Sequence, residues 1–235
     1  MRDVIGIGNA MVDVITETDD DFLVKNGLVK GGMVLIDIET SDRICKDITY
    51  SKEMSGGSVG NTMVGLASLG GTGSYVGKIS DDSLGRAFLR DMNNMDIMFD
   101  TPISDTGLPT ARCLVFVTKD GQRSMATYLG SCVELSPADI YPKTIEDHAI
   151  TYIEGYLWDS PGAKKAIIKC ASAANNSNRK VALSLSDSFC VNRHRDSFKE
   201  LISDHVDVLF ANESEIQSLY EGSDLSKSIQ YASNN

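Results

Sequence analysis

A glycine-rich stretch carries the residues whose types and spacing could bind a polar ligand. Gly56 and Gly57 precede Ser58, and Asn61 follows within one turn of a predicted apolar helix. Ser58 is a favourable N-cap, and a helix entered through two glycines leaves backbone N–H groups free to hold an oxygen-rich ligand. We expect the amide of Asn61 to point at the same ligand, a small polyhydroxylated molecule. Tight packing around the helix is the alternative explanation for these glycines.

Two further pairs of polar residues follow predicted strands. Asn9 and Asp13 lie at the end of the first strand, where a carboxylate could accept two hydrogen bonds from a vicinal diol. Asn212 and Glu215 lie between a strand and a helix, where a carboxylate near a phosphate could hold Mg²⁺ through water. Taken alone, each pair is better explained more simply, Asp13 as a solvated turn residue and the second pair as a helix cap.

Three other sequence patterns do not support the catalytic or binding site that each suggests at first. Gly6 and Gly8 begin like a dinucleotide-binding fingerprint, but Met11 replaces the third glycine and the segment continues as a strand. The Arg193–Asp196 segment has the letters of a protein-kinase catalytic loop without the asparagine that should follow. No serine or cysteine forms a triad pattern with the three scattered histidines, so nucleophilic catalysis has no support.

The composition restricts partners and location. The chain has 235 residues, 42% of them hydrophobic, which suits a globular protein with one large core, with or without a small appendage. The net charge of −11 argues against nucleic acid and against an anionic membrane surface as partners. Five widely spaced cysteines without a CxxC pair argue against a disulfide framework and a zinc site. Because we find neither a signal peptide nor a membrane-spanning run, we expect a cytoplasmic protein.

Strands and helices alternate regularly in the second half of the chain, with near-continuous apolar strands. This pattern predicts a parallel sheet covered by helices on both faces. The first half has more hairpin character, with Asp120 and Gly121 as a turn signal, and could supply a small β layer. We expect strands at 4–15 (interrupted by a tight place at 6–8), 33–36, 75–76, 114–117, 123–129, 149–153, 180–185 and 206–210. We expect helices at 19–28, 44–50, 59–69, 84–95, 161–168, 195–203 and 214–220.

Taken together, the segments resemble the PfkB, or ribokinase-like, family of sugar and nucleoside kinases. The motifs occur in that family's order: 9–13, 56–61, 77–85 and 212–215. The glycine-rich stretch resembles the family's first signature closely, and the resemblance covers nearly the whole chain. Within the family, the chain looks most like the adenosine kinase branch. The sequence segments on which this resemblance rests are 8–13, 152–157, 183–189 and 206–213.

The resemblance implies an α/β fold with a doubly wound, mostly parallel sheet and a small β lid. Residues 1–235 would form one ribokinase-like domain, the N-terminal part of the family fold, with lid segments at about 14–37 and 110–130. The implied reaction moves the γ-phosphoryl of ATP to a primary hydroxyl of a nucleoside or sugar, with ATP and Mg²⁺ as cofactors and a small molecule as partner. A homodimer is compatible with the family.

The resemblance also implies roles for individual residues. Asp13 would accept hydrogen bonds from ribose hydroxyls, with Asn9 in support. The rest of the sugar site would come from the glycine-rich stretch: Gly56, Gly57, Ser58 and Asn61. Tyr156 or Leu157 would lie near the base of a nucleoside. Asn212 and Glu215 would organise phosphates and Mg²⁺, Glu215 acting on the metal through water.

One departure from the family is large. The second signature, a Gly-Ala-Gly-Asp segment that carries the catalytic base, is absent from the 235 residues. The catalytic base is therefore unknown, and we expect a C-terminally incomplete fold that is inactive by itself. The alternatives to an adenosine kinase-like enzyme are a kinase of ribose or fructose type and a non-catalytic fragment that binds a nucleoside or sugar.

Overall fold

The main body of the protein is a parallel sheet. The computed structural model describes residues 1–235 apart from 50, 223 and 235. Within this part of the chain, six strands pair in the order β11-β10-β9-β1-β5-β6, all of them parallel. Their bounds are β1 Arg2–Ile7, β5 Gly73–Val76, β6 Met98–Phe99, β9 His148–Glu154, β10 Lys180–Ser184 and β11 Val208–Phe210. The predicted parallel sheet is confirmed.

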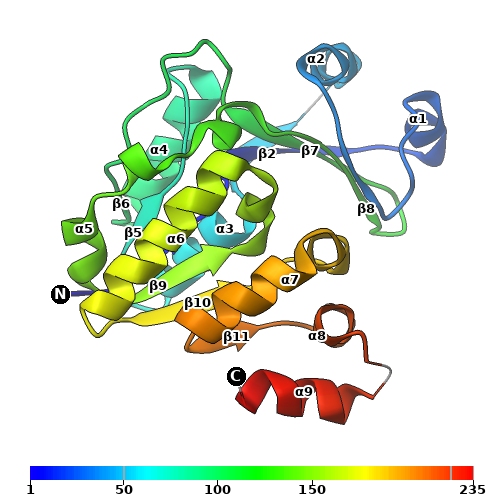
Figure 1. Cartoon of the computed structure of the whole chain (residues 1–235). Coiled ribbons are helices and arrows are strands. Elements are labelled where there is room, and N and C mark those ends of the chain that lie inside the picture. Colours follow the sequence, from blue (N-terminus) through cyan, green and yellow to red (C-terminus); the bar gives the residue numbers. More distant parts are fainter. Residues whose placement is uncertain (50, 223, 235) are drawn as a thin grey trace.

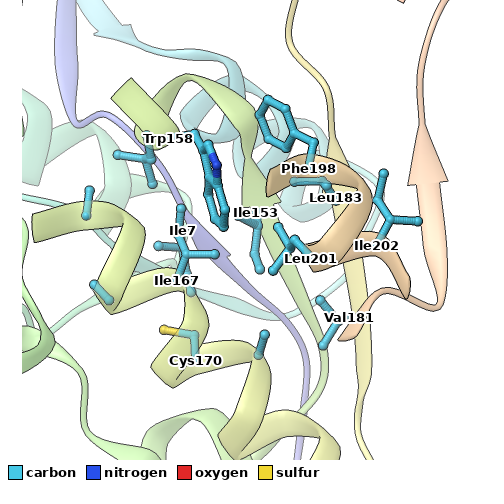
Figure 2. Close-up of a cluster of buried hydrophobic side chains, with 14 of the residues drawn as sticks. Ile7, Ile153, Trp158, Ile167, Cys170, Val181, Leu183, Phe198, Leu201 and Ile202 are labelled. Atoms are coloured by element: carbon cyan, nitrogen blue, oxygen red, sulfur yellow. The ribbon is translucent and has the colours of Figure 1, made fainter. Parts of the chain in front are cut away.

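Helices cover both faces of this sheet (Figure 1). On one face, α3 (Ser58–Ser68) and α4 (Ser83–Asn94) bury side chains against β1 and β5. The opposite face packs against α6 (Pro161–Asn176) and α7 (Ser188–His205), and Figure 2 shows aliphatic residues of the strands around Trp158 and Phe198. The remaining helices of this body are α5 (Pro142–Glu146), α8 (Glu213–Tyr220) and α9 (Leu225–Asn234). The fold is doubly wound, as the sequence predicted.

A second, mixed sheet projects from the body, at the upper right of Figure 1. Its strand order in the described residues is β3-β8-β7-β2-β4. The bounds are β2 Met11–Glu17, β3 Met33–Leu35, β4 Lys52–Gly56, β7 Ala111–Val117 and β8 Arg123–Tyr128. One face is closed by α1 (Asp20–Lys25) and α2 (Ile38–Lys46), which pack on residues such as Val14 and Leu114. The predicted β layer is present; its action as a lid stays a prediction.

In the second sheet and its helices, one predicted helix has the wrong bounds and one strand was missed. The helix expected at 44–50 is α2, which begins at Ile38 because Asp37 caps it by accepting a hydrogen bond from the Thr40 N–H at 2.7 Å; Tyr50 lies outside the described residues. Strand β4 was not expected, because its sequence has little β propensity and forms a strand only by pairing with β2. No described helix has the length and apolarity that crossing a membrane requires.

Candidate functional site

Part of the predicted site gathers where the two sheets meet: Asn9, Asp13 and the start of the glycine-rich stretch. β1 has β9 on one side and β5 on the other, so the strand order reverses beside it. In open α/β sheets, ligands bind at the carboxyl ends of strands at such a reversal. The chain leaves β1 at Ile7 and enters the second sheet at Met11, so Asn9 lies at the junction between the sheets.

Glu154, the last residue of β9, is the centre of a buried hydrogen-bond network. The side chain is 1% exposed. Its Oε1 accepts from Asn9 Nδ2 at 2.7 Å and from the Asn9 backbone N–H at 3.4 Å. Its Oε2 accepts from Ser58 Oγ at 2.7 Å and from the Val59 N–H at 3.2 Å. One carboxylate therefore connects β9, the junction after β1 and the start of α3.

Burial raises the pKa of Glu154, and the hydrogen bonds from Ser58, Asn9 and Val59 act against that rise. A buried carboxylate is costly unless donors surround it. The four donors meet that requirement, and each of them belongs to a segment that the sequence predicted as part of the site.

The two glycines before α3 lie directly beneath Asn9 and Asp13. A Cβ at position 56 would overlap the carboxyl group of Asp13, and a Cβ at position 57 would overlap the backbone oxygen of Asn9. Gly57 also has φ +81°, which favours glycine. The glycines thus let the backbone approach the two polar residues closely, which tight helix packing alone does not require.

Asp13 is half-buried in the second sheet, on the face opposite α1 and α2. Burial raises the pKa of its carboxyl group, and the charge of Arg123 partly offsets the effect. Among the described residues, no protein group donates a hydrogen bond to the Asp13 carboxylate. Its acceptor capacity is therefore available to a ligand.

The cap expected of Ser58 is wrong, whereas the role expected of Asn61 stays a prediction. The N-cap of α3 is Gly57, and the side chain of Ser58 makes no capping hydrogen bond because it donates to Glu154. Asn61 lies on the first turn of α3 with an exposed side chain. The structure places Ser58 with Asn9 at Glu154, whereas the Asn61 amide has no hydrogen-bond partner in the described part of the chain.

Tyr156 and Leu157 separate into two environments. The Tyr156 hydroxyl donates to the Ser186 carbonyl oxygen at 3.3 Å, and burial raises its pKa. Leu157 is 2% exposed and belongs to the main core beside Trp158. We therefore correct the expectation for Leu157: its side chain packs the core and has almost no surface for a nucleobase.

Asn212 and Glu215 form a reciprocal helix cap at the start of α8. Asn212 Oδ1 accepts from the Glu215 N–H at 2.9 Å, and Glu215 Oε2 accepts from the Asn212 N–H at 3.0 Å. Asn212 Nδ2 also donates to Glu215 Oε1 at 2.7 Å. The simpler explanation of this pair, that it caps the helix, is therefore confirmed. The described contacts do not join it to Asn9 or Asp13, although β11 ends at the same edge of the sheet as β1.

Sequence reasoning missed two residues of this region. Glu154 ends an apolar strand, and an acid at that point next to Gly155 was the available signal. Phe189, in the first turn of α7, is 74% exposed. An aromatic residue two positions after a helix cap, here Asp187, was the signal that could have singled it out. No cluster of three metal-ligating side chains occurs in the described residues.

Comparison with known proteins identifies the class. The model of the pfkB family of carbohydrate kinases matches residues 3–234. The chain belongs to this family, as its motifs predicted. The structure has a TM-score of 0.92 to adenosine kinase from Sinorhizobium meliloti, with 46% identity over 99% of this chain and 72% of that one. It has a TM-score of 0.91 to a probable sugar kinase from Rhizobium etli, at 44% identity over 98% of this chain and 70% of that one.

Curated relatives are more distant and longer. Guanosine-inosine kinase from Escherichia coli is 25% identical over 231 residues, which is 94% of this chain and 53% of the relative. The 5-dehydro-2-deoxygluconokinase of Listeria monocytogenes is 28% identical over 167 residues, 68% of this chain and 51% of the relative. The chain therefore spans about half the length of these relatives.

Proposed function

We propose that this chain binds a nucleoside and serves an ATP-dependent phosphotransferase that moves the γ-phosphoryl of ATP to the primary hydroxyl of that nucleoside, adenosine being the first candidate. The observation that carries the proposal is the Asp13 carboxylate, unpaired with any described donor and seated over Gly56 at the junction of the two sheets. The similarity to adenosine kinase from Sinorhizobium meliloti supports it.

The sugar end of the ligand is matched by the polar residues of the junction. Two adjacent oxygens of a carboxylate can accept hydrogen bonds from two neighbouring hydroxyls of a ribose ring. Asn9 adds an amide, and the start of α3 adds Asn61. The glycines beneath them allow the ring to approach the backbone.

Apolar side chains beside Asp13 favour a nucleoside over a free sugar. In the second sheet Asp13 pairs in register with Met54 on one side, and through Cys113 and Thr127 the same row reaches Leu35. Met54 and Leu35 are exposed. A planar base would bury this apolar surface, which a free sugar would leave in water.

Exposed Phe189 offers the base a second apolar surface, from the main body. Aromatic rings stack favourably on one another, and Phe189 lies in the helix turn that follows β10. Tyr156 lies near the same turn, since its hydroxyl bonds to Ser186.

The residues expected to bind ATP and Mg²⁺, Asn212 and Glu215, match those ligands less well than the junction matches a sugar. Both oxygens of Glu215 accept from Asn212, and the side chain is 7% exposed, so direct coordination of Mg²⁺ does not fit the arrangement. A contact through water stays part of the proposal. When bound, the ion would neutralise phosphate charge, and the second sheet would exclude water from the transferred group. No residue of this chain is assigned as the base. A cytoplasmic location belongs to the same proposal.

Calorimetric titration of the chain with adenosine, guanosine, ribose and fructose tests the proposal. We expect adenosine to bind most tightly and Asp13→Ala to weaken it by at least about tenfold, because the carboxylate loses two charge-assisted hydrogen bonds. Tighter binding of ribose or fructose would identify a sugar kinase instead. Absence of binding by all four ligands would refute the proposal. Phosphoryl transfer is assayed in parallel with ATP and Mg²⁺.

A further inference from the structure

We propose that Glu154 is a positioning residue that sets the hydrogen-bonding polarity of the sugar site at Asn9 and Asp13, so that this part of the site accepts ligand groups that donate. This inference rests on the proposed function. It concerns a residue that does not need to touch the ligand, and it explains which ligand chemistry the site admits.

An ionised carboxylate can only accept hydrogen bonds. The side-chain amide of Asn9 must therefore turn its nitrogen toward Glu154, where Nδ2 lies 2.7 Å from Oε1. The amide oxygen of Asn9 is thereby directed away from Glu154. No described residue donates a hydrogen bond to this oxygen, so it remains an acceptor for a ligand.

This orientation adds a second acceptor to the carboxylate of Asp13 at the junction. Asn9 offers an oxygen, and Asp13 offers a carboxylate that no described group has engaged. Two acceptors at the same junction attract hydroxyl groups and repel phosphate or carboxylate oxygens. The site therefore selects a neutral polyol, such as an unphosphorylated ribose ring, at this position.

The second oxygen of Glu154 holds the start of α3 in place at the site. Its bonds to Ser58 and Val59 hold the first turn of α3 against β9. Gly57 precedes this turn and lies against the backbone oxygen of Asn9. The Glu154 carboxylate thus holds the side-chain amide of Asn9 and the backbone at Gly57 in a single arrangement.

Direct contact of Glu154 with the ligand is the competing explanation. Each of its oxygens already accepts from two protein donors, and the side chain is 1% exposed. A ligand hydroxyl would have to displace one of these donors. The geometry therefore favours an action through Asn9 and α3.

A polarity swap separates the two explanations. Glu154→Gln places an amide nitrogen against donors, and Asn9→Asp places two carboxylates against each other. In the double variant, the nitrogen of the glutamine can donate to the new aspartate, whose other oxygen still serves the ligand. Each single variant should bind adenosine about tenfold to a hundredfold more weakly, whereas the double variant should return to within about threefold of the unsubstituted chain.

The matched control is Asp207→Asn, which changes a carboxylate far from the junction. Asp207 lies at the amino end of β11 and accepts hydrogen bonds from Lys180 and from the Val181 N–H. We expect this variant to keep its adenosine affinity. Far-ultraviolet circular dichroism and thermal unfolding without ligand confirm that each variant is folded at the titration temperature.

The outcomes are distinct. If the unsubstituted chain binds adenosine and Glu154→Gln binds it equally well, the positioning role is refuted while the proposed function stands. If both single variants lose affinity and the double variant is folded but does not regain it, Glu154 acts on the ligand directly and the polarity argument fails. If the unsubstituted chain does not bind adenosine, the proposed function fails, and this inference fails with it.

Discussion

The carboxyl group of Asp13 occupies the space in which residue 56 would otherwise carry a side chain. Asp13 belongs to β2 and Gly56 ends β4, its antiparallel neighbour. The glycine lies two positions after Met54, which pairs with Asp13, and so it is on the same face of the sheet. The position of the Asp13 carboxylate therefore depends on a residue without a side chain.

Gly56→Ala should displace the Asp13 carboxylate and weaken adenosine binding by about tenfold, with a loss of roughly 1–3 kcal/mol in the free energy of unfolding. Gly65→Ala is the matched control. Gly65 lies inside α3 with nothing within 4 Å of an added Cβ, so alanine there should stabilise the protein by about 1 kcal/mol. Urea unfolding and calorimetric titration measure both. Equal affinity in the two variants would contradict the importance of the Asp13–Gly56 contact.

Adenosine affinity should fall on acidification. Burial raises the pKa of Asp13, so protonation begins at a higher pH than for an ordinary aspartate. Only the ionised form accepts from both hydroxyls, and affinity should fall by about tenfold for each pH unit below this raised pKa. The dissociation constant measured between pH 7 and pH 4.5 tests this. Asp13→Asn should bind weakly with a flatter pH profile, and an unchanged profile would assign the effect to another group.

The stability of the protein should decrease below neutral pH through His148. Its ring bonds to the Thr144 carbonyl oxygen at 2.7 Å and to Ser74 Oγ at 2.9 Å. Burial lowers its pKa below the ordinary 6.5. As the pH falls below 6.5, the unfolded chain takes up a proton before the folded one, so folding stability is lost by up to about 1.4 kcal/mol per pH unit until the folded pKa is reached.

The test for His148 compares the slopes of the melting temperature against pH. His148→Asn retains a donor for Thr144 but does not titrate. It should melt at a lower temperature at pH 7.5 and show a smaller decrease between pH 7 and pH 5.5. Parallel slopes in the two proteins would show that the titration of another group governs acid stability.

Asn212→Ala should lower the free energy of unfolding by about 1 kcal/mol, because the N–H of Glu215 loses its acceptor and the Glu215 carboxylate loses the side-chain donor Asn212 Nδ2. Asn212→Ser retains a side-chain acceptor at the N-cap and should cost less. Urea unfolding without nucleotide or metal measures the capping role alone. If both variants unfold like the unsubstituted chain, the pair does not serve as a cap.

The local chemistry of the chain was readable from the sequence itself. Regular alternation of apolar strands and helices predicted the parallel sheet, since both faces of such strands must be buried. Asp120 and Gly121 predicted the β7–β8 hairpin, which the antiparallel pairing confirms. The glycine-rich stretch and its polar neighbours led to the family, because these residue types at these spacings are specific.

Only the tertiary structure could decide how those residues are combined. Asn9 and Glu154 are 145 positions apart and meet because β1 and β9 pair side by side. Ser58 seemed a cap when considered with its sequence neighbours, but a buried carboxylate from β9 attracts its hydroxyl more strongly. β4 exists because β2 is beside it, and Leu157 belongs to the core because α6 and α7 enclose it. Local propensity acts between residues near in sequence, whereas burial and pairing depend on which distant segments the fold brings together.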